Sequence, residues 1–123
     1  SNVMQQILEP EEISQITIVI GAITDLARIC RVIKEHKVDK IIHLASLLHP
    51  YSDNFPDEAV QVNIVGHTTI LEAMRIMDVK KLVYASSVVV YGNQSSHDKL
   101  VLDNDARHAP VSMYGATKSL MNT

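Results

Sequence analysis

Cysteine is almost absent from this chain of 123 residues: Cys30 is the single one, so no disulfide forms within it. A reducing compartment, the cytoplasm, is therefore the expected location. The net charge is −3 and no block of basic residues occurs, which argues against nucleic acid or an anionic membrane as a partner. No apolar run approaches the roughly 18 residues that a membrane span needs. Since 46% of the residues are apolar, the sequence predicts a soluble globular domain.

Glycine is also scarce. The four glycines, at positions 21, 66, 92 and 115, lie too far apart to form a glycine-rich turn that holds a phosphate at a helix N-terminus. The six histidines make no metal-ligand spacing with the cysteine or with a carboxylate pair, so no metal site is expected. His43 lies within an apolar run, and we expect it to be a hydrogen-bonded core residue. These absences exclude a phosphate loop of the chain's own and a metal centre.

Three short apolar runs are typical of strands covered on both faces: ITIVIG (16–21), KIIHLAS (40–46) and KLVYASS (81–87). Between them, apolar spacing predicts helices from a cap at Thr24 or Asp25 to about His36, from Pro56 to about Met77, and from about Met113 onward. Cys30 lies on the apolar stripe of the first helix, which favours core packing over a reactive thiol. Residues 1–15 are expected to be an irregular lead-in to one domain over 16–123, with loops at 47–55 and 92–112.

This alternation of strands and helices predicts an α/β fold with about three parallel strands joined by right-handed crossovers. Ligands of such sheets bind at the carboxyl ends of the strands. Residues 22–25, 45–49 and 86–93 follow the three apolar runs. We therefore expect these three loops to meet at one binding edge.

Tyr114 precedes Lys118 by four residues, which places both side chains on one face of the last helix. An ammonium beside a phenol favours the phenolate and lowers the phenol pKa from about 10, which suits proton transfer. A hydroxyl from Ser87, after the third apolar run, would orient the reacting oxygen. On the spacing alone, an incidental Tyr and Lys on an exposed helix remains the more common explanation.

Four segments occur in the order, and at the spacings, of a known family: IIHLAS, VNIVGHTTILEAMR, YASSVVVYG and PVSMYGATK. Together with ITIVIGAITD they make the chain resemble the extended short-chain dehydrogenases/reductases, the NAD-dependent epimerases and dehydratases. The resemblance implies a partial Rossmann-like sheet that lacks the first βαβ unit and the C-terminal substrate domain.

The resemblance implies Tyr114 as the catalytic acid/base, Lys118 as the partner of the nicotinamide ribose, and Ser87 as the hydroxyl that bonds the reacting oxygen. Ser86, its neighbour, is easily confused with it. The implied cofactor is NAD, with NADP also open, and its implied contacts are Ala22, Ile23, Leu44, Ala45, Ser46, Asn63, Tyr114 and Lys118. For Asn63, a purely structural bond to nearby backbone is a serious alternative.

Ala22 departs from the family pattern. Members usually have an acid at this position, directly after the strand glycine, where its carboxylate reads the adenine amino group. Ile23 still offers its backbone, and Asp25 lies three residues too late.

The residues and the resemblance together predict a fragment or truncated form of an NAD(P)-dependent sugar-nucleotide epimerase, dehydratase or reductase. We expect it to be inactive alone, and to bind the cofactor poorly, because the pyrophosphate loop is missing. A nucleotide sugar or another small molecule would be the substrate of the complete protein. The resemblance also implies a homodimer through residues 56–77 and 113–123. Two alternatives stay open: a non-catalytic dimerisation or interaction module, and an extended-family dehydrogenase acting on a non-sugar substrate.

In the family's strand order, two strands that are missing here separate residues 16–21 from residues 40–46. Unpaired edges of apolar strands are costly. We therefore expect residues 16–21 to move inward and pair with residues 40–46, or another chain to fill the gap.

Overall fold

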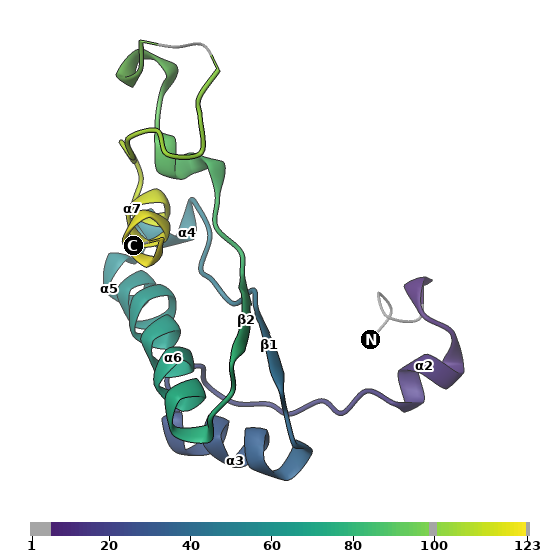
Figure 1. The fold of residues 1–123 in the computed structure, drawn as a ribbon. Coiled ribbons are helices and arrows are strands. Elements are labelled where there is room, and N and C mark those ends of the chain that lie inside the picture. Colours follow the sequence, from purple (N-terminus) through teal and green to yellow (C-terminus); the bar gives the residue numbers. More distant parts are fainter. Residues whose placement is uncertain (1–5, 99–100, 123) are drawn as a thin grey trace.

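The computed structural model describes residues 6–98 and 101–122. Its elements, in order, are α2 (Pro10–Ser14), α3 (Leu26–His36), β1 (Lys40–His43), α4 (Tyr51–Asn54), α5 (Pro56–Ala59), η1 (Val60–Val65), α6 (Gly66–Met77), β2 (Lys81–Tyr84), η2 (Val88–Tyr91), η3 (Gln94–Ser96) and α7 (Met113–Met121). β1 and β2 pair in parallel, with Lys40 opposite Lys81 and His43 opposite Tyr84. The fold is therefore the expected α/β type, with a sheet of two strands (Figure 1).

The helices α3 and α6 pack against each other and cover one face of this sheet (Figure 1). Side chains alternate along a strand, so Ile41 and Leu82 point into this core while Ile42 and Val83 point away from it. The latter two are 69% and 62% exposed. The centre of the core consists of Ile33, Ile70, Ala73, Met74 and Val79. The sheet thus has one covered and one open face.

The helix ends follow the local chemistry of the sequence. Asp25 caps α3, because its Oδ1 accepts a hydrogen bond from the Arg28 N–H at 3.0 Å. Ser112 caps α7 in the same way, accepting from the Gly115 N–H at 3.0 Å. The expected helix from Pro56 to Met77 is continuous, and its middle segment η1 is π-helical. All three predicted long helices are confirmed.

The prediction of a strand over residues 16–21 is wrong. Residues 16–20 have no strand partner within the described part of the chain, and Ile18 and Ile20 are 67% and 85% exposed. A β-branched run becomes a strand only where a neighbour accepts and donates its backbone hydrogen bonds. In Figure 1 the segment runs past β1 toward α2 without joining the sheet. The inward pairing with residues 40–46 is therefore wrong as well, and filling of the gap by another chain stays a prediction.

Two short α-helices, and the 3₁₀ segments η2 and η3, occur where irregular structure was expected. Pro10 begins α2, and the Glu12 carboxylate accepts a hydrogen bond from the Glu9 N–H at 2.9 Å at its start. The single turn α4 lies within the expected loop 47–55. Residues 1–5 of the expected lead-in, and residues 99–100 of the expected loop 92–112, lie outside the described residues. No helix in the described ranges has the length and apolar character that crossing a membrane requires.

Candidate functional site

Lys118 lies on α7, and its side chain is buried, with 2% of the residue's surface exposed. Its Nζ donates a hydrogen bond to the carbonyl oxygen of Ala85 at 2.7 Å, directly after β2. The same atom lies 4.5 Å from the ring centroid of Tyr84 and 5.8 Å from that of Tyr114. The ammonium and the Tyr114 ring therefore face each other, as their four-residue spacing predicted.

Two phenols thus lie close to one ammonium, but they differ in surroundings. Burial raises the pKa of Tyr84 to about 12, with a smaller contribution from Tyr114. Burial also lowers the pKa of Lys118. Tyr114 is only half-buried and lines a surface pocket together with His49, Asp53, Val89, Gly92, Asn93, Val111 and Ser112. Of the two phenols, Tyr114 is the one that lines this pocket.

The two serines after β2 have different partners. Ser86 Oγ accepts a hydrogen bond from the Asn122 side-chain amide at 2.7 Å, which joins the end of β2 to the end of α7. Ser87 Oγ accepts a long bond, 3.5 Å, from the Val89 N–H at the start of η2. Within the described residues it makes no hydrogen bond to Tyr114. Ser86 therefore links the segment after β2 to the end of α7, while the Ser87 O–H donates no hydrogen bond within the described residues.

Asn63 is fully buried in η1 and bonds to two separate segments. Its Oδ1 accepts from the Leu47 N–H at 2.7 Å, and its Nδ2 donates to the Leu47 carbonyl and to Thr117 Oγ1, both at 3.0 Å. The Thr117 hydroxyl in turn donates to the Tyr114 carbonyl at 2.8 Å. Both amide hydrogens of Asn63 are thus used. Asn63 therefore makes the bonds to nearby backbone that its alternative, purely structural role predicts.

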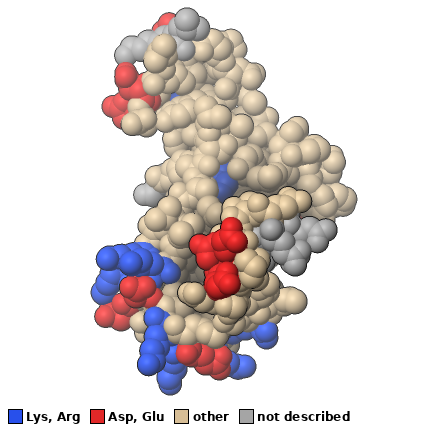
Figure 2. Space-filling model, turned by 90° about the vertical axis from the view of Figure 1, so that its right-hand side faces the viewer, with Lys and Arg blue, Asp and Glu red and all other residues tan. Residues whose placement is uncertain are grey.

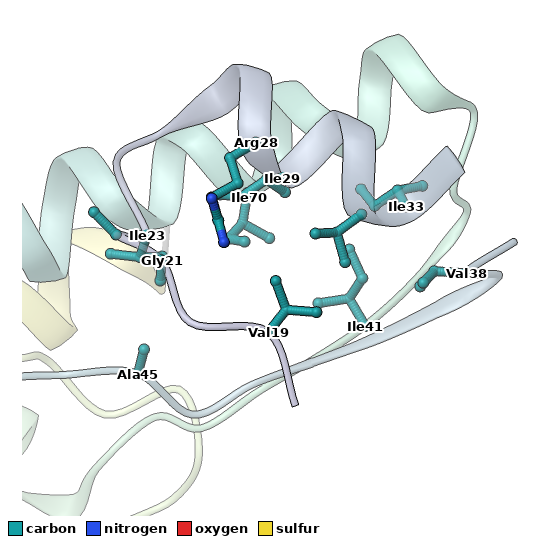
Figure 3. Close-up of a pocket in the computed structure, with 12 residues that line it drawn as sticks. Val19, Gly21, Ile23, Arg28, Ile29, Ile33, Val38, Ile41, Ala45 and Ile70 are labelled. Atoms are coloured by element: carbon teal, nitrogen blue, oxygen red, sulfur yellow. The ribbon is translucent and has the colours of Figure 1, made fainter. Parts of the chain in front are cut away.

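Ala22, Ile23 and Ala45 line one apolar groove of about 340 Å³ between residues 19–23, α3 and β1. Figure 3 shows the Arg28 side chain reaching into the same space from α3. Two other implied cofactor residues lie differently: Leu44 is 67% exposed, and Ser46 has a buried Oγ without a hydrogen-bond partner among the described residues. The structure therefore places Ala22, Ile23 and Ala45 in the groove and Asn63, Tyr114 and Lys118 at α7, while Leu44 and Ser46 belong to neither group.

Sequence reasoning missed a set of three aromatic rings beneath Lys118. His43 on β1 stacks on His67 of α6, with centroids 5.2 Å apart and planes at 26°, and the His67 ring lies 4.7 Å from the Tyr84 ring. His43 is buried, as expected of a core residue, but its Nε2 has no hydrogen-bond partner among the described residues, so the expected hydrogen bonding is not met at this atom. The signal for this cluster was strand alternation, which turns His43 and Tyr84 toward the helices, and the one-turn spacing of His67 from Asn63.

Charges of both signs mix at the lower end of the face shown in Figure 2, and most of the rest of this face is uncharged. No continuous basic surface appears on it. Residues 6–98 and 101–122 hold no group of three or more His, Cys, Asp or Glu side chains that would bind a metal ion.

A family model described as GDP-mannose 4,6 dehydratase matches residues 2–123. The chain belongs to this family. The match confirms the resemblance to NAD-dependent epimerases and dehydratases and the partial Rossmann-like fold.

Individual relatives agree with the family match. The UDP-glucose 4-epimerase of Lactobacillus helveticus is 32% identical over 102 residues, which are 82% of this chain and 30% of that protein. A solved UDP-glucose-4-epimerase from Stenotrophomonas maltophila, with bound NAD and formylated UDP-arabinopyranose, superposes with a TM-score of 0.78 at 32% identity. The superposition covers 85% of this chain and 30% of that one. An L-threonine dehydrogenase from Clostridium difficile has a TM-score of 0.72 at 35% identity, over 80% of this chain and 30% of its own. The chain thus spans about 30% of these proteins.

Proposed function

We propose that this chain carries the proton-transfer residues of an NAD-dependent sugar-nucleotide epimerase or dehydratase, with Tyr114 as the acid/base. The observation that carries the proposal is the buried Lys118 ammonium, 5.8 Å from the ring of a pocket-lining tyrosine. A positive charge beside this ring can stabilise negative charge that develops on the Tyr114 oxygen during proton transfer. Tyr114 is then suited to take a proton from a substrate hydroxyl.

Each residue has a separate task in this proposal. Tyr114 accepts the proton, Lys118 supplies the positive charge beside it, and Ser87 donates a hydrogen bond to the substrate oxygen. Asn63 does not touch the substrate; through Thr117 it holds the first turn of α7, where Tyr114 lies. NAD, when bound, would supply the hydride acceptor.

The residues present fit the two ends of this cofactor. The groove beside Ala22, Ile23 and Ala45 is apolar and suits a flat adenine ring, although no carboxylate follows Gly21 to read its amino group. Lys118 has three N–H donors, and one of them bonds Ala85. Leu44 and Ser46 flank the groove residue Ala45 in the sequence, and the buried Oγ of Ser46 is unpartnered among the described residues. No glycine-rich turn is present for the pyrophosphate, so we propose that this chain alone is catalytically inactive.

A chimera tests the proposal directly. Residues 16–122 replace the matching segment of the Lactobacillus helveticus relative, and turnover of UDP-glucose is measured. We expect Tyr114→Phe to lower turnover by about 10²- to 10⁴-fold, while Tyr51→Phe, at an exposed position on α4, leaves it unchanged. An active chimera that Tyr114→Phe does not slow would refute the proposed role. NADH titrated into the unmodified chain should show no binding at micromolar concentrations.

The similarity to an L-threonine dehydrogenase favours a second candidate, an extended-family dehydrogenase with a non-sugar substrate. The same Tyr114, Lys118 and Ser87 would serve it, because both reactions remove a proton from a hydroxyl. Oxidation of L-threonine by a chimera with that protein, without epimerase activity in the first chimera, would select this candidate.

We also propose a homodimer through residues 56–77 and 113–123, in a reducing compartment such as the cytoplasm. Leu71 and Ile76 on α6 and Leu120 on α7 support it, since these apolar side chains are exposed on both segments. Leu71→Glu should convert a dimer to a monomer in sedimentation, and Ile42→Glu, on the open sheet face, should not. A Leu71→Glu chain that stays dimeric would contradict this interface. A dimer without any cofactor binding in a complete chimera would favour the alternative of a non-catalytic interaction module.

A further inference from the structure

The ring nearest to the Lys118 ammonium belongs to Tyr84 and not to the proposed acid/base. Nζ lies 4.5 Å from the Tyr84 centroid, within the range of a cation–π interaction, against 5.8 Å for Tyr114. Ala85, which accepts the hydrogen bond from Nζ, is the next residue along the chain. The end of β2 therefore holds the ammonium from two sides, by a ring face and by a carbonyl.

The Tyr84 ring is itself fixed by two imidazoles. The His67 ring lies 4.7 Å away at 59°, and the His43 ring 5.6 Å away at 36°. Neither His43 Nε2 nor His67 Nδ1 has a hydrogen-bond partner among the described residues, although both atoms are buried. The contact between these residues is therefore ring packing, to which β1, α6 and β2 each contribute one ring. Its effect is to hold the Tyr84 ring in place.

We propose that Tyr84 is a positioning residue, whose ring face, fixed by His67 and His43, seats the Lys118 ammonium beside Tyr114. Tyr84 does not compete for the proton, because burial raises its pKa to about 12. Among the described residues, its hydroxyl makes a single weak contact, 3.9 Å to the sulfur of Met121. The ring face is thus the part of Tyr84 that matters to Lys118. The relevance to catalysis rests on the proposed function, whereas the seating of the ammonium does not.

The first test needs no variant of Tyr84. The chain is labelled with ¹³C-lysine, and the Lys118 signal is assigned by its loss in Lys118→Met. Protons next to an ammonium over a ring face are shifted upfield by the ring current, so we expect the Lys118 Hε signals upfield of those of the other lysines. Lys118 Hε signals at the ordinary lysine position would overturn the proposal.

The second test compares three variants by titration of the same signals. Tyr84→Phe keeps the ring and should leave the pKa of Lys118 unchanged. Tyr84→Leu fills the space without a ring face, so the charged form loses its partner and the pKa should fall by roughly 0.5 to 1. Val83→Leu, on the open face of the same strand, is the control. Equal pKa values of Lys118 in the Phe and Leu variants would mean that Tyr84 only fills volume.

His67 supplies a third arm if Tyr84→Leu does not fold. His67→Phe keeps a ring against Tyr84 and should preserve the upfield Hε shift of Lys118, whereas His67→Leu should reduce it by half or more. Identical shifts in both variants would remove His67 from the proposal. These outcomes are independent of cofactor binding, so failure of the NAD chemistry in the chimera would not be mistaken for failure of the seating.

Discussion

The Asn63 side-chain amide donates a hydrogen bond to the Thr117 hydroxyl at 3.0 Å, and the two residues are 54 positions apart in the sequence. Because Asn63 also bonds both backbone groups of Leu47, one side chain joins the loop after β1 to the helix of Tyr114 and Lys118. The candidate site is therefore held together by a polar contact in a fully buried position.

We predict that Asn63→Ala destabilises the chain by about 2–4 kcal/mol, because three hydrogen bonds are lost and the Leu47 groups lose their partner. Urea unfolding measures this. Asn54→Ala, at an exposed position on α4, should change stability by less than about 0.5 kcal/mol. A double-mutant cycle with Thr117→Val isolates the bond between the helices, and a coupling of zero would show that it contributes nothing.

Gly66→Ala should destabilise the chain by about 1–3 kcal/mol. A Cβ at Gly66 would come within 2.5 Å of Ile23 Cγ2, at a buried contact between α6 and the segment that lines the groove. Gly21→Ala is the matched control, since its Cβ would meet the flexible Arg28 side chain at an exposed position. Thermal unfolding compares the two, and equal midpoints would contradict the packing described for Gly66.

Stability should fall as the pH drops from about 7 to 5. Burial first, and then the charge of Lys118, lower the pKa of His67; burial, His67 and Lys118 lower that of His43. Below the ordinary value of 6.5 the unfolded chain therefore binds protons that the folded chain does not. The stability from these neutral rings is complete above pH 6.5 and is lost as the pH falls, by up to about 1.4 kcal/mol per pH unit for each group.

Urea unfolding at pH 8, 6.5 and 5 measures this slope. His67→Phe should make the slope shallower because one of the two groups no longer titrates. His36→Gln, at an exposed position, should leave it unchanged. A free energy of unfolding that rises toward pH 5 would mean that the two rings are not held neutral in the folded chain.

Ile20→Lys should change the free energy of unfolding by less than about 0.5 kcal/mol, because Ile20 is 85% exposed in the unpaired segment. Ile70→Ala, in the core between α3 and α6, should cost about 2–5 kcal/mol. If Ile20→Lys were as costly as Ile70→Ala, residues 16–20 would be buried in solution, against a partner in trans or within the chain.

The helices and the two paired strands were predictable because their signals are local. Asp25 and Ser112 have side-chain oxygens that can accept a hydrogen bond from the first turn of a helix. The apolar stripe of residues 56–77 is long enough to indicate a helix without ambiguity. The run ITIVIG was misread for a physical reason: its β-branched composition reports what a strand would bury, and not whether a neighbouring strand is present. A strand, unlike a helix, cannot satisfy its own backbone.

In the candidate site too, features with a local sequence signal were predictable and features that depend on distant segments were not. The four-residue spacing was enough to place Tyr114 beside Lys118. No sequence signal told which of Ser86 and Ser87 bonds Asn122, because that contact depends on where α7 ends relative to β2. The ring cluster of Tyr84, His67 and His43 depends on the register of three separate elements, which only the folded chain defines.

The π-helical segment η1 changes the phase of the helix that contains it. A π turn holds one residue more than an α turn, so it rotates everything that follows by about 100° around the axis. Before and through this segment the helix packs against α7, and after it α6 packs against α3. A single extra residue thus lets one continuous helix pack against α7 on one side and against α3 on another. Deleting Ile64 would restore one α-helical register along residues 56–77. The helix could then keep its packing against α3 in the core or its packing against α7 at the candidate site, but not both.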